Sequence, residues 1–459
     1  MRPILHPSSF RDPSGFIFRI HGDIYRQINY CYREHYECLM GSGLYARLVQ
    51  DGLLVQHVDI GLEQAQTTDA YTVIQPALVS FISYPYEWCF GQLKAAALAT
   101  LNLQRNAIEC GMSLKDASAY NMQFVQGKPC LIDTLSFEIY RDGIPWTAYR
   151  QFCQHFLAPL TLMAYCDVRL GQLLRTHLDG IPLELAASLL PISSRLKPTL
   201  LLHLFLHAAA QKRLSVRNAI KERKRRSFDR RAMLGLVDSL ETAIRGLRWE
   251  PSRIGWTDYV PEDGYGEKGV QHKKELVAEF LKIATPHLVW DLGANTGEFS
   301  RLASRCGIFT IAFDNDPGVV ELNYRRAMMD DDKALLPLLM DITNPSPSLG
   351  WENQEREAWL ERNSADVVLA LALVHHLAVG CNVPLDRLAD FFARLGRWLI
   401  VEFVPKTDLR VQQLLAVRED IFVDYTREGF ECAFARFFSI RRVEQIVGSE
   451  RTIFLMEKF

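Results

Sequence analysis

A glycine-containing turn directly after an apolar run constrains this chain more than any other feature. The run 287–292 opens with apolar residues, which is typical of a buried parallel strand. It passes into Asp291-Leu292-Gly293-Ala294-Asn295-Thr296-Gly297, and the residues after this turn predict a helix. Glycine allows a sharp turn and a close approach of the backbone to a ligand. The pattern therefore predicts a ligand site at the end of the strand, with the N-terminus of the helix directed at the ligand.

The spacing of the turn distinguishes it from a dinucleotide-binding fingerprint. It has the form D-x-G-x-x-x-G and lacks G-x-G-x-x-G. In this form it resembles the first motif of the class I S-adenosylmethionine-dependent methyltransferases. The resemblance implies that Asp291 lies near the methionine part of the cofactor. It also implies that Gly293 and Gly297 make room for the adenosine and the carboxypropyl chain, with Ala294 and Asn295 between them in the site.

The second predicted strand of this region, 309–314, ends in a carboxylate. Asp314 follows the glycine turn at a spacing suited to an acid that accepts both ribose hydroxyls, and Asn315 would lie beside it in the cofactor site. Asp316 is an alternative for the ribose contact. Because an aspartate at a strand end is also a common helix cap or turn residue, that structural role stays open for each acid of the motif.

Two further strands extend the pattern. The third, 335–340, ends in Asp341-Ile342. By resemblance, Asp341 would bond the adenine amino group and Ile342 would pack on the ring. The fourth, 365–373, would contribute Ala370 to the cofactor site.

Three residues after the fourth and fifth strands are catalytic candidates. His375 and His376 follow the fourth strand, and Glu402 lies near the end of the fifth, 398–403. The carboxyl ends of parallel strands line one crevice, so we expect these side chains to face the ligand. An unperturbed imidazole, with a pKa near about 6.5, suits proton transfer at neutral pH. The alternatives are that the histidines pack beneath the substrate pocket and that Glu402 is structural.

The resemblance implies an α/β fold for residues 255–459, a Rossmann-like domain with a mostly parallel, seven-stranded sheet whose last two strands are antiparallel. A helix over 270–281 would close over the cofactor, with Lys273 and Lys274 near its carboxylate unless they are exposed helix lysines. Tyr425 and Phe430, in an insertion before the last two strands, are candidate substrate walls or core residues. The same half of the chain is more loosely similar to NoeA-type nodulation proteins, a likeness that names no chemistry.

The N-terminal part carries a second constellation. Asp116 and Asn121 precede Asp133 at a predicted strand end. This pattern resembles the catalytic loop of protein-kinase-like and aminoglycoside-phosphotransferase-like folds, in which such residues orient a hydroxyl and hold metal ions. The hairpin 16–29 would cover the phosphates, but it has one glycine, and Arg26 replaces the expected strand lysine. The alternative is that these residues form turns and cap a strand end.

We therefore expect an α+β, kinase-like domain over 1–145 and a mainly helical segment over 146–250 that continues it. The methyltransferase-like domain over 255–459 would follow. The basic run 221–226 is either a solvated helix face or linker, or a phosphate contact.

Composition narrows the classes of partner. The chain has 54 acidic and 52 basic residues and a formal net charge of −2, so global charge does not indicate a nucleic-acid partner. Ten cysteines without zinc-site or C-x-x-C spacing predict mostly small buried side chains, no metal site and a reducing compartment. No apolar run is long enough to span a membrane, and the N-terminus lacks a signal-peptide core. These features predict a cytoplasmic protein without a membrane partner.

The function predicted from the sequence is S-adenosylmethionine-dependent methyl transfer to an oxygen or nitrogen of a small-molecule or carbohydrate-like acceptor. Nucleic-acid methylation is disfavoured because no N-P-P-Y-like tetrapeptide follows the fourth strand, where Ala370-Leu371-Ala372-Leu373 stands instead. Two alternatives stay open. One is a kinase-like phosphotransferase fused to a methyltransferase domain, and the other is a non-catalytic module that has kept the cofactor site.

Overall fold

The computed structural model describes residues 4–210, 229–251 and 266–459. The chain divides into two compact units. The first comprises 1–249 with 348–357, and the second comprises 250–347 with 358–459. The basic run 221–226 and most of the segment expected to precede the helix of 270–281 lie outside the described residues. No helix in the described parts of the chain is long and apolar enough to cross a membrane.

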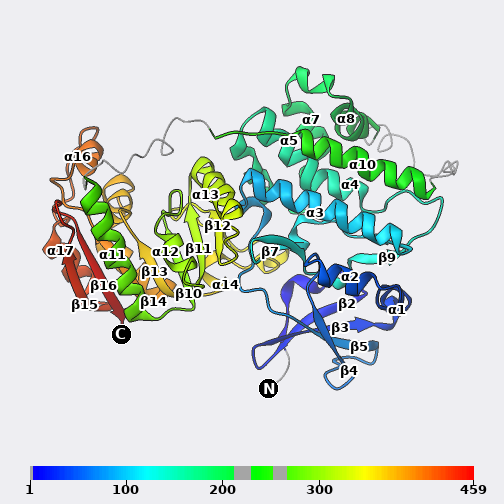
Figure 1. The fold of residues 1–459 in the computed structure, drawn as a ribbon, viewed down its shortest axis with the longest axis horizontal. Helices are drawn as coiled ribbons and strands as arrows, with labels where there is room; N and C mark the ends of the chain where they lie inside the picture. The colour runs from blue at the N-terminus through cyan, green and yellow to red at the C-terminus, as the bar shows by residue number, and fades with distance from the viewer. Residues whose placement is uncertain (1–3, 211–228, 252–265) are drawn as a thin grey trace. The chain divides into compact units, whose positions relative to one another are not determined.

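The second unit is built on one seven-stranded sheet with the order β12-β11-β10-β13-β14-β16-β15 (Figure 1). Strands β10 to β14 pair in parallel, whereas β16 runs antiparallel to both β14 and β15. This arrangement confirms the predicted mostly parallel sheet with an antiparallel last pair. The strands are β10 (Leu288–Leu292), β11 (Phe309–Asp314), β12 (Leu335–Leu339), β13 (Ala365–Ala370), β14 (Gly396–Phe403), β15 (Phe438–Gln445) and β16 (Thr452–Lys458).

Both faces of this sheet are covered. Side chains alternate along a strand, so Val289 and Trp290 of β10 lie on opposite faces. Val289 belongs to a buried cluster with Phe280 and Ala303 of two helices, whereas Trp290 stacks on Trp359 of another helix with ring centroids 5.3 Å apart. The α-helices of the unit are α11 (Gly266–Ala284), α12 (Ser300–Ser304), α13 (Pro317–Met329), α14 (Trp359–Arg362), α15 (Leu385–Leu395), α16 (Leu409–Leu415) and α17 (Arg427–Phe434).

The first unit contains a five-stranded antiparallel sheet with the order β1-β2-β3-β5-β4 and two separate strand pairs, β6 with β9 and β7 with β8. Its strands are β1 (Ile4–Leu5), β2 (Gly15–Ile20), β3 (Asp23–Asn29), β4 (His57–Gly61), β5 (Ala70–Pro76), β6 (Met112–Leu114), β7 (Met122–Val125), β8 (Lys128–Leu131) and β9 (Phe137–Ile139). The predicted hairpin 16–29 is formed by β2 and β3.

Helices make up most of the remainder of the first unit, including the segment predicted to be mainly helical (Figure 1). They are α1 (Arg33–Gly41), α2 (Leu44–Gln50), α3 (Phe90–Glu109), α4 (Tyr149–Phe152), α5 (Ala158–Tyr165), α6 (Leu173–Thr176), α7 (Leu183–Leu189), α8 (Pro198–Leu200) and α10 (Arg230–Gly246). The resemblance of this unit to kinases stays a prediction.

The acids of the second constellation take part in local structure. Asp133 pairs with Arg26 of β3 at 2.6 Å, and both side chains are largely buried. Asp133 also accepts a hydrogen bond from the hydroxyl of Ser136 at 2.7 Å and caps the short helix η5 (Thr134–Ser136). Asp116 accepts hydrogen bonds from the backbone of Ser118 and the side chain of Gln151. These contacts are the capping and turn-forming roles that the sequence left open.

The segment 348–357, which lies between β12 and β13 in the chain, is grouped with the first unit. Glu355 pairs with Arg11 at 2.5 Å. The guanidinium of Arg356 lies 4.5 Å from the ring centroid of Tyr120. No sequence signal marked this segment, and the predicted division near 250–255 does not include it.

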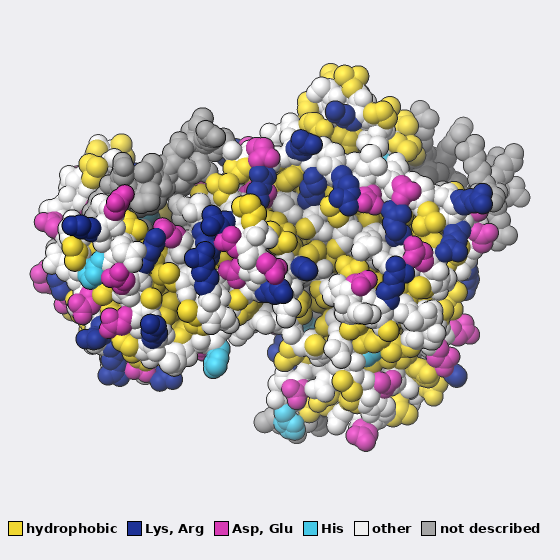
Figure 2. Space-filling model, in the orientation of Figure 1, with side chains coloured by type: hydrophobic (Ala, Val, Ile, Leu, Met, Phe, Trp, Pro, Cys, Tyr) yellow, Lys and Arg dark blue, Asp and Glu magenta, His cyan; other side chains and the backbone are white. Residues whose placement is uncertain are grey.

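Cysteine burial and surface charge can be compared with the composition. All ten cysteines are free thiols, and only Cys89, Cys130 and Cys153 are buried. The expectation that most cysteines are buried is therefore wrong. Basic and acidic side chains are interspersed over the face shown in Figure 2, in line with the nearly balanced charge of the chain.

Replacement of Asp133 by alanine should lower the free energy of unfolding of the first unit by about 3 kcal/mol, because Arg26 would stay buried without its partner. Urea unfolding of the full chain, followed by circular dichroism, measures this loss. The matched control is Glu109→Ala, which breaks the exposed pair with Arg47 and should cost less than about 1 kcal/mol. Equal losses in the two variants would contradict a stabilising role of the Arg26–Asp133 pair.

Candidate active site

A cavity of about 860 Å³ opens among the residues that follow the parallel strands of the second unit. This volume lies within the range of about 300–1,000 Å³ that is usual for small-molecule sites. Ten of the predicted site residues line it: Asp291, Gly293, Ala294, Asn295, Asp314, Asn315, Asp341, Ile342, His375 and His376. The structure thus brings together, from four neighbouring strands, most of the residues that the motifs singled out.

Two predicted cofactor residues do not line the cavity. Gly297 has a φ of +78°, and a Cβ at this position would lie 2.2 Å from the side-chain oxygen of Asn323. Glycine at 297 therefore permits packing of the turn against α13 rather than ligand contact. Ala370 is fully buried within β13, and the residues 371–373 line the cavity in its place.

The turn after β10 is held by the backbone of β11. The N–H groups of Gly293 and Ala294 both donate to the carbonyl of Phe313, at 2.9 and 3.0 Å. The N–H of Asn295 donates to Asp314 Oδ2 at 2.8 Å. Because these donors are used within the protein, they fix the shape of the turn.

The helix predicted after the turn is short, and Phe299 and Arg301 at its start line the cavity. α12 begins only at Ser300 and has five residues, so the chain between Gly293 and the helix is a loop. The backbone of the turn at 293–296 lines the cavity directly and forms what we call the backbone cradle. Gly293 has a φ of +70°, and a Cβ there would approach Leu373 Cδ1 at 3.2 Å.

Asp291 is a buried carboxyl group at the floor of the cavity. It is 2% exposed, and its Oδ2 accepts a hydrogen bond from the hydroxyl of Ser300 at 2.6 Å. Burial raises the pKa of Asp291 to about 6, against the opposing effect of the Ser300 hydrogen bond and the charge of Lys273. A cationic ligand near this group would favour its ionised form.

The two candidates for a ribose contact are separated by the structure. Asp316 caps α13 by accepting a hydrogen bond from the N–H of Gly318 at 2.7 Å, and it is not part of the cavity lining. Asp314 lines the cavity, and burial raises the pKa of its carboxyl group. On the neighbouring strand, Asp341 and Ile342 line the same cavity.

The histidine pair lies on the lining that follows β13. His375 is 1% exposed, and neither of its ring nitrogens has a hydrogen-bond partner among the described residues. Burial lowers the pKa of His375 well below its ordinary value, and the charges of His376, Arg451 and Lys273 act in the same direction. Its ring is therefore neutral at pH 7, with one nitrogen able to donate and the other able to accept a hydrogen bond. Burial, with the charge of Arg451, also lowers the pKa of His376.

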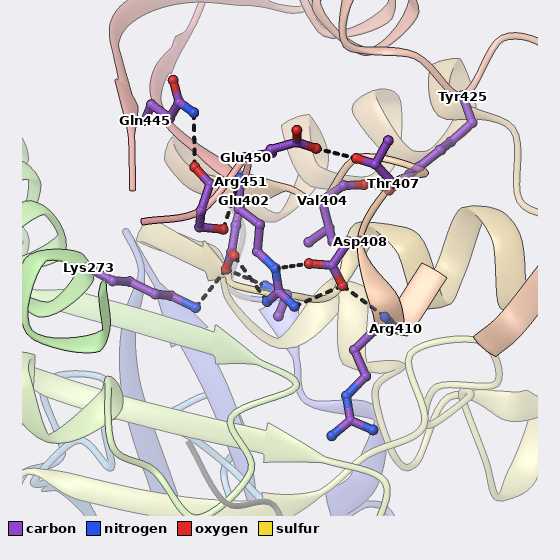
Figure 3. Close-up of polar contacts among 12 residues, drawn as sticks. Lys273, Glu402, Val404, Thr407, Asp408, Arg410, Tyr425, Gln445, Glu450 and Arg451 are labelled. Atoms are coloured by element: carbon purple, nitrogen blue, oxygen red, sulfur yellow. Dashed lines mark hydrogen bonds and ion pairs between the residues drawn. The ribbon is translucent and has the colours of Figure 1, made fainter. Parts of the chain in front are cut away.

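Glu402 is the centre of a buried charge network (Figure 3). Its Oε2 accepts hydrogen bonds from Lys273 Nζ at 2.6 Å and from the N–H of Ala372 at 2.9 Å. Arg451 Nη1 lies 3.6 Å from Glu402 Oε1, and Arg451 Nε pairs with Asp408 at 2.7 Å. Glu402 is fully buried and does not line the cavity. Its prediction as a catalytic residue is therefore corrected: it positions other groups.

The network shapes the lining through Ala372 and Lys273. Ala372 has a φ of +51°, a conformation that L-residues rarely adopt, and its hydrogen bond to Glu402 supports the turn that leads to His375. Lys273 is buried against Glu402, with its Nζ 4.6 Å from the ring centroid of Phe299. It is not an exposed helix lysine.

The predicted aromatic walls belong to the core. The hydroxyl of Tyr425 donates to the carbonyl of Val404 at 2.8 Å, and Phe430 is fully buried against Phe434 and other aromatic rings. Sequence reasoning missed Arg410 and Arg451, which do line the cavity. The available signal was Asp408-Leu409-Arg410, a helix cap followed by a cation.

One curated protein and two solved structures are reported as similar to the chain. Nodulation protein NoeA of Rhizobium meliloti (strain 1021) is 36% identical over 463 residues, which cover 100% of this chain and 97% of that protein. Magnesium protoporphyrin IX methyltransferase (ChlM) from Synechocystis PCC 6803 with bound SAH has a TM-score of 0.30 and 18% identity, over 42% of this chain and 84% of that one. N-methyltransferase NodS from Bradyrhizobium japonicum WM9 has a TM-score of 0.31 and 10% identity, over 42% and 98%. No family model matches.

Substitution of Asp291 by asparagine should change how stability depends on pH. The pKa of Asp291 is raised from 3.8 to about 6 in the folded state, so its contribution is greatest below pH 4 and is lost as pH rises through 6. From pH 4 to pH 7 the wild type should lose about 2 kcal/mol of unfolding free energy relative to Asp291→Asn. Urea unfolding at both pH values tests this, and an identical pH dependence in the two proteins would contradict it.

Proposed function

The chain belongs to the family of nodulation protein NoeA, and we propose that it is an S-adenosylmethionine-dependent methyltransferase acting on an oxygen or nitrogen of a small-molecule or carbohydrate-like acceptor. One observation carries the proposal. Gly293 directly follows β10, and Asp314 is the last residue of the adjacent strand β11. Both line a single cavity together with Asp341, which lies just after the next strand, β12. A side-chain-free turn beside a carboxylate is the arrangement that an adenosine and its ribose need.

The residues present fit this cofactor. Gly293 lines the cavity, and a Cβ there would meet Leu373, another lining residue, at 3.2 Å, so a larger residue would crowd this part of the cavity. Asp314 would accept hydrogen bonds from the ribose hydroxyls. Asp341 and Ile342, after the neighbouring strand β12, would meet the adenine. The methionine end would then lie towards Asp291 and β13.

Bound S-adenosylmethionine supplies a methyl group that its sulfonium makes electrophilic. The protein's main task is to hold the attacking atom on the axis opposite sulfur, and such positioning contributes up to about 7–11 kcal/mol. His375 would accept a hydrogen bond from the O–H or N–H of the acceptor, because its buried ring is neutral. It would take the proton as the new bond to carbon forms, a contribution of about 10²–10⁴-fold.

A phosphotransferase activity of the first unit has less support. Asp133, the predicted metal ligand, pairs with Arg26 at 2.6 Å, so a magnesium ion would have to displace a guanidinium. The other alternative, a non-catalytic module, predicts cofactor binding without turnover. Incubation with methyl-labelled S-adenosylmethionine and a small-molecule extract, followed by detection of labelled product, separates it from the enzyme.

Gly293→Val should abolish binding of S-adenosylhomocysteine, because valine would fill the cradle. Isothermal calorimetry on the full chain measures this. Gly307→Val is the matched control: Gly307 also has a positive φ, +79°, but no atom lies within 4 Å of a Cβ built there. The control should share the backbone strain and keep the affinity. Unchanged affinity in Gly293→Val would contradict the placement of the site.

Asp314→Ala should weaken binding of S-adenosylhomocysteine by about 1.5–3 kcal/mol, the range for hydrogen bonds to a charged group. Asp316→Ala should lower stability by about 1 kcal/mol through loss of a helix cap and leave the affinity unchanged. Calorimetry and urea unfolding of both variants test the pair. A larger loss of affinity in Asp316→Ala would move the ribose contact to Asp316.

A further inference from the structure

Carboxylates are confined to one part of the cavity lining. The four carboxylates of its lining, Asp291, Glu298, Asp314 and Asp341, all belong to β10, β11, β12 or the loops that follow them. The described lining residues that follow β13 and β14 include no carboxylate, and the cations on that side are Arg410 and Arg451. Arg301, Arg305 and Arg326, from the helices after β10 and β11, line the cavity as well. The β10–β12 end therefore carries both signs of charge, whereas the lining that follows β13 and β14 carries cations and no carboxylate.

The order of the strands indicates which end of the cavity would hold the cofactor and which the acceptor. The sheet runs β12-β11-β10-β13-β14, and Asp341 and Asp314 lie at the β12 and β11 positions. With the adenosine at these strands, the transferable methyl group would face β13 and β14. The β13–β14 end, which has no lining carboxylate, is then the end that receives the acceptor.

The two arginines at this end have different surroundings. Arg451 is 1% exposed, and its guanidinium is bound by Asp408 at 2.7 and 3.0 Å. Arg410 is only partly buried, and its guanidinium points away from the Asp408–Arg451 pair (Figure 3). Asp408 also accepts a hydrogen bond from the backbone N–H of Arg410 at 2.9 Å. The charge network thus fixes the point from which the Arg410 side chain extends along the cavity lining.

A second, independent feature at the same end indicates a polar ligand. His375 is 1% exposed, yet neither ring nitrogen has a hydrogen-bond partner among the described residues. A buried polar atom without a partner costs free energy of roughly 1–3 kcal/mol. A ligand that carries an O–H or N–H would supply the missing partner.

We propose that the methyl acceptor is an anion, a small molecule with a carboxylate or phosphate group that binds Arg410 while its nucleophilic O–H or N–H contacts His375. This inference rests on the proposed function. A guanidinium suits such oxyanions because its donors match their geometry. Arg410 is then the residue that determines acceptor specificity.

The anion would also assist the transfer step. The acceptor's oxygen or nitrogen forms a bond to the methyl carbon as the S–CH3 bond breaks, the sulfur keeps that electron pair as S-adenosylhomocysteine leaves, and the acceptor's proton moves to His375. The oxyanion itself is unchanged. Its negative charge, held near the ring, favours the protonated imidazole and so offsets the effect of burial.

The test uses the full chain and three probes of similar size: benzoate, phenyl phosphate and the neutral benzamide. Affinities are measured by saturation-transfer NMR with and without saturating S-adenosylhomocysteine, at constant ionic strength. The wild type should bind at least one of the anions roughly tenfold more tightly than benzamide. Arg410→Gln should lose this preference, and Arg410→Lys should retain part of it. Preference for benzoate or for phenyl phosphate identifies which oxyanion the site takes.

Arg427→Gln is the control, because Arg427 pairs with Glu431 on the surface of α17 and does not line the cavity. It should keep the wild-type preference. Equal binding of anions and benzamide, undetectable anion binding, or an unchanged preference in Arg410→Gln would overturn the proposal. The measurements without S-adenosylhomocysteine report on Arg410 even if that ligand does not bind, so failure of the proposed function is distinguishable from failure of this inference.

Discussion

The buried carboxylate of Glu402 is the group on which the β13–β14 side of the cavity depends. It joins Lys273 of α11, the turn at Ala372 after β13 and, through Arg451, the strand β16. Arg451 also pairs with Asp408, the N-cap residue of α16, and so connects this helix to the network. A buried charge that loses one partner typically costs about 3–5 kcal/mol, so these elements are held in one arrangement. The residue that the sequence suggested as a catalyst thus acts by fixing the positions of others.

The site has two parts with different physical origins. The cofactor side is made by backbone: a turn whose N–H groups bond to β11 and whose Gly293 leaves space that a side chain would fill. The other side is made by charge, because His375 and Arg410 extend from segments that the Glu402 network holds. A backbone cradle tolerates one ligand shape, whereas a surface set by charged side chains can change its ligand through single substitutions. Under the proposed function, the choice of acceptor would therefore be set on the β13–β14 side.

The sequence predicted those site residues whose roles depend on neighbours in the chain, and it missed the roles that depend on distant partners. The turn at 291–297, the acid at the end of β11 and the histidines after β13 follow from short patterns, and the cavity gathers them. Glu402 was misjudged because its partner Lys273 lies 129 residues away in the chain, and no local pattern reports that pairing. Gly297 shows the same limit: positive φ explains a glycine in the turn, but only the approach of Asn323 shows that it serves packing. The start of α12 could not be placed to the residue, because the motif does not specify the length of the loop that precedes it.

In the first unit, too, a distant partner decides the role of an acid at a strand end, and there it removes the acid from ligand binding. Asp133 stands at a strand end, like Asp314, but Arg26 of β3 lies 2.6 Å from it, and the acid also caps a helix. In the second unit, Asp291, Asp314 and Asp341 line the cavity. None of these three acids has a close arginine partner of this kind among the described contacts. An ion pair formed within the protein occupies the carboxylate that a metal ion would need, and displacing it would leave a buried guanidinium uncompensated. The position of one arginine thus separates an acid that can receive a ligand from one that stabilises the fold.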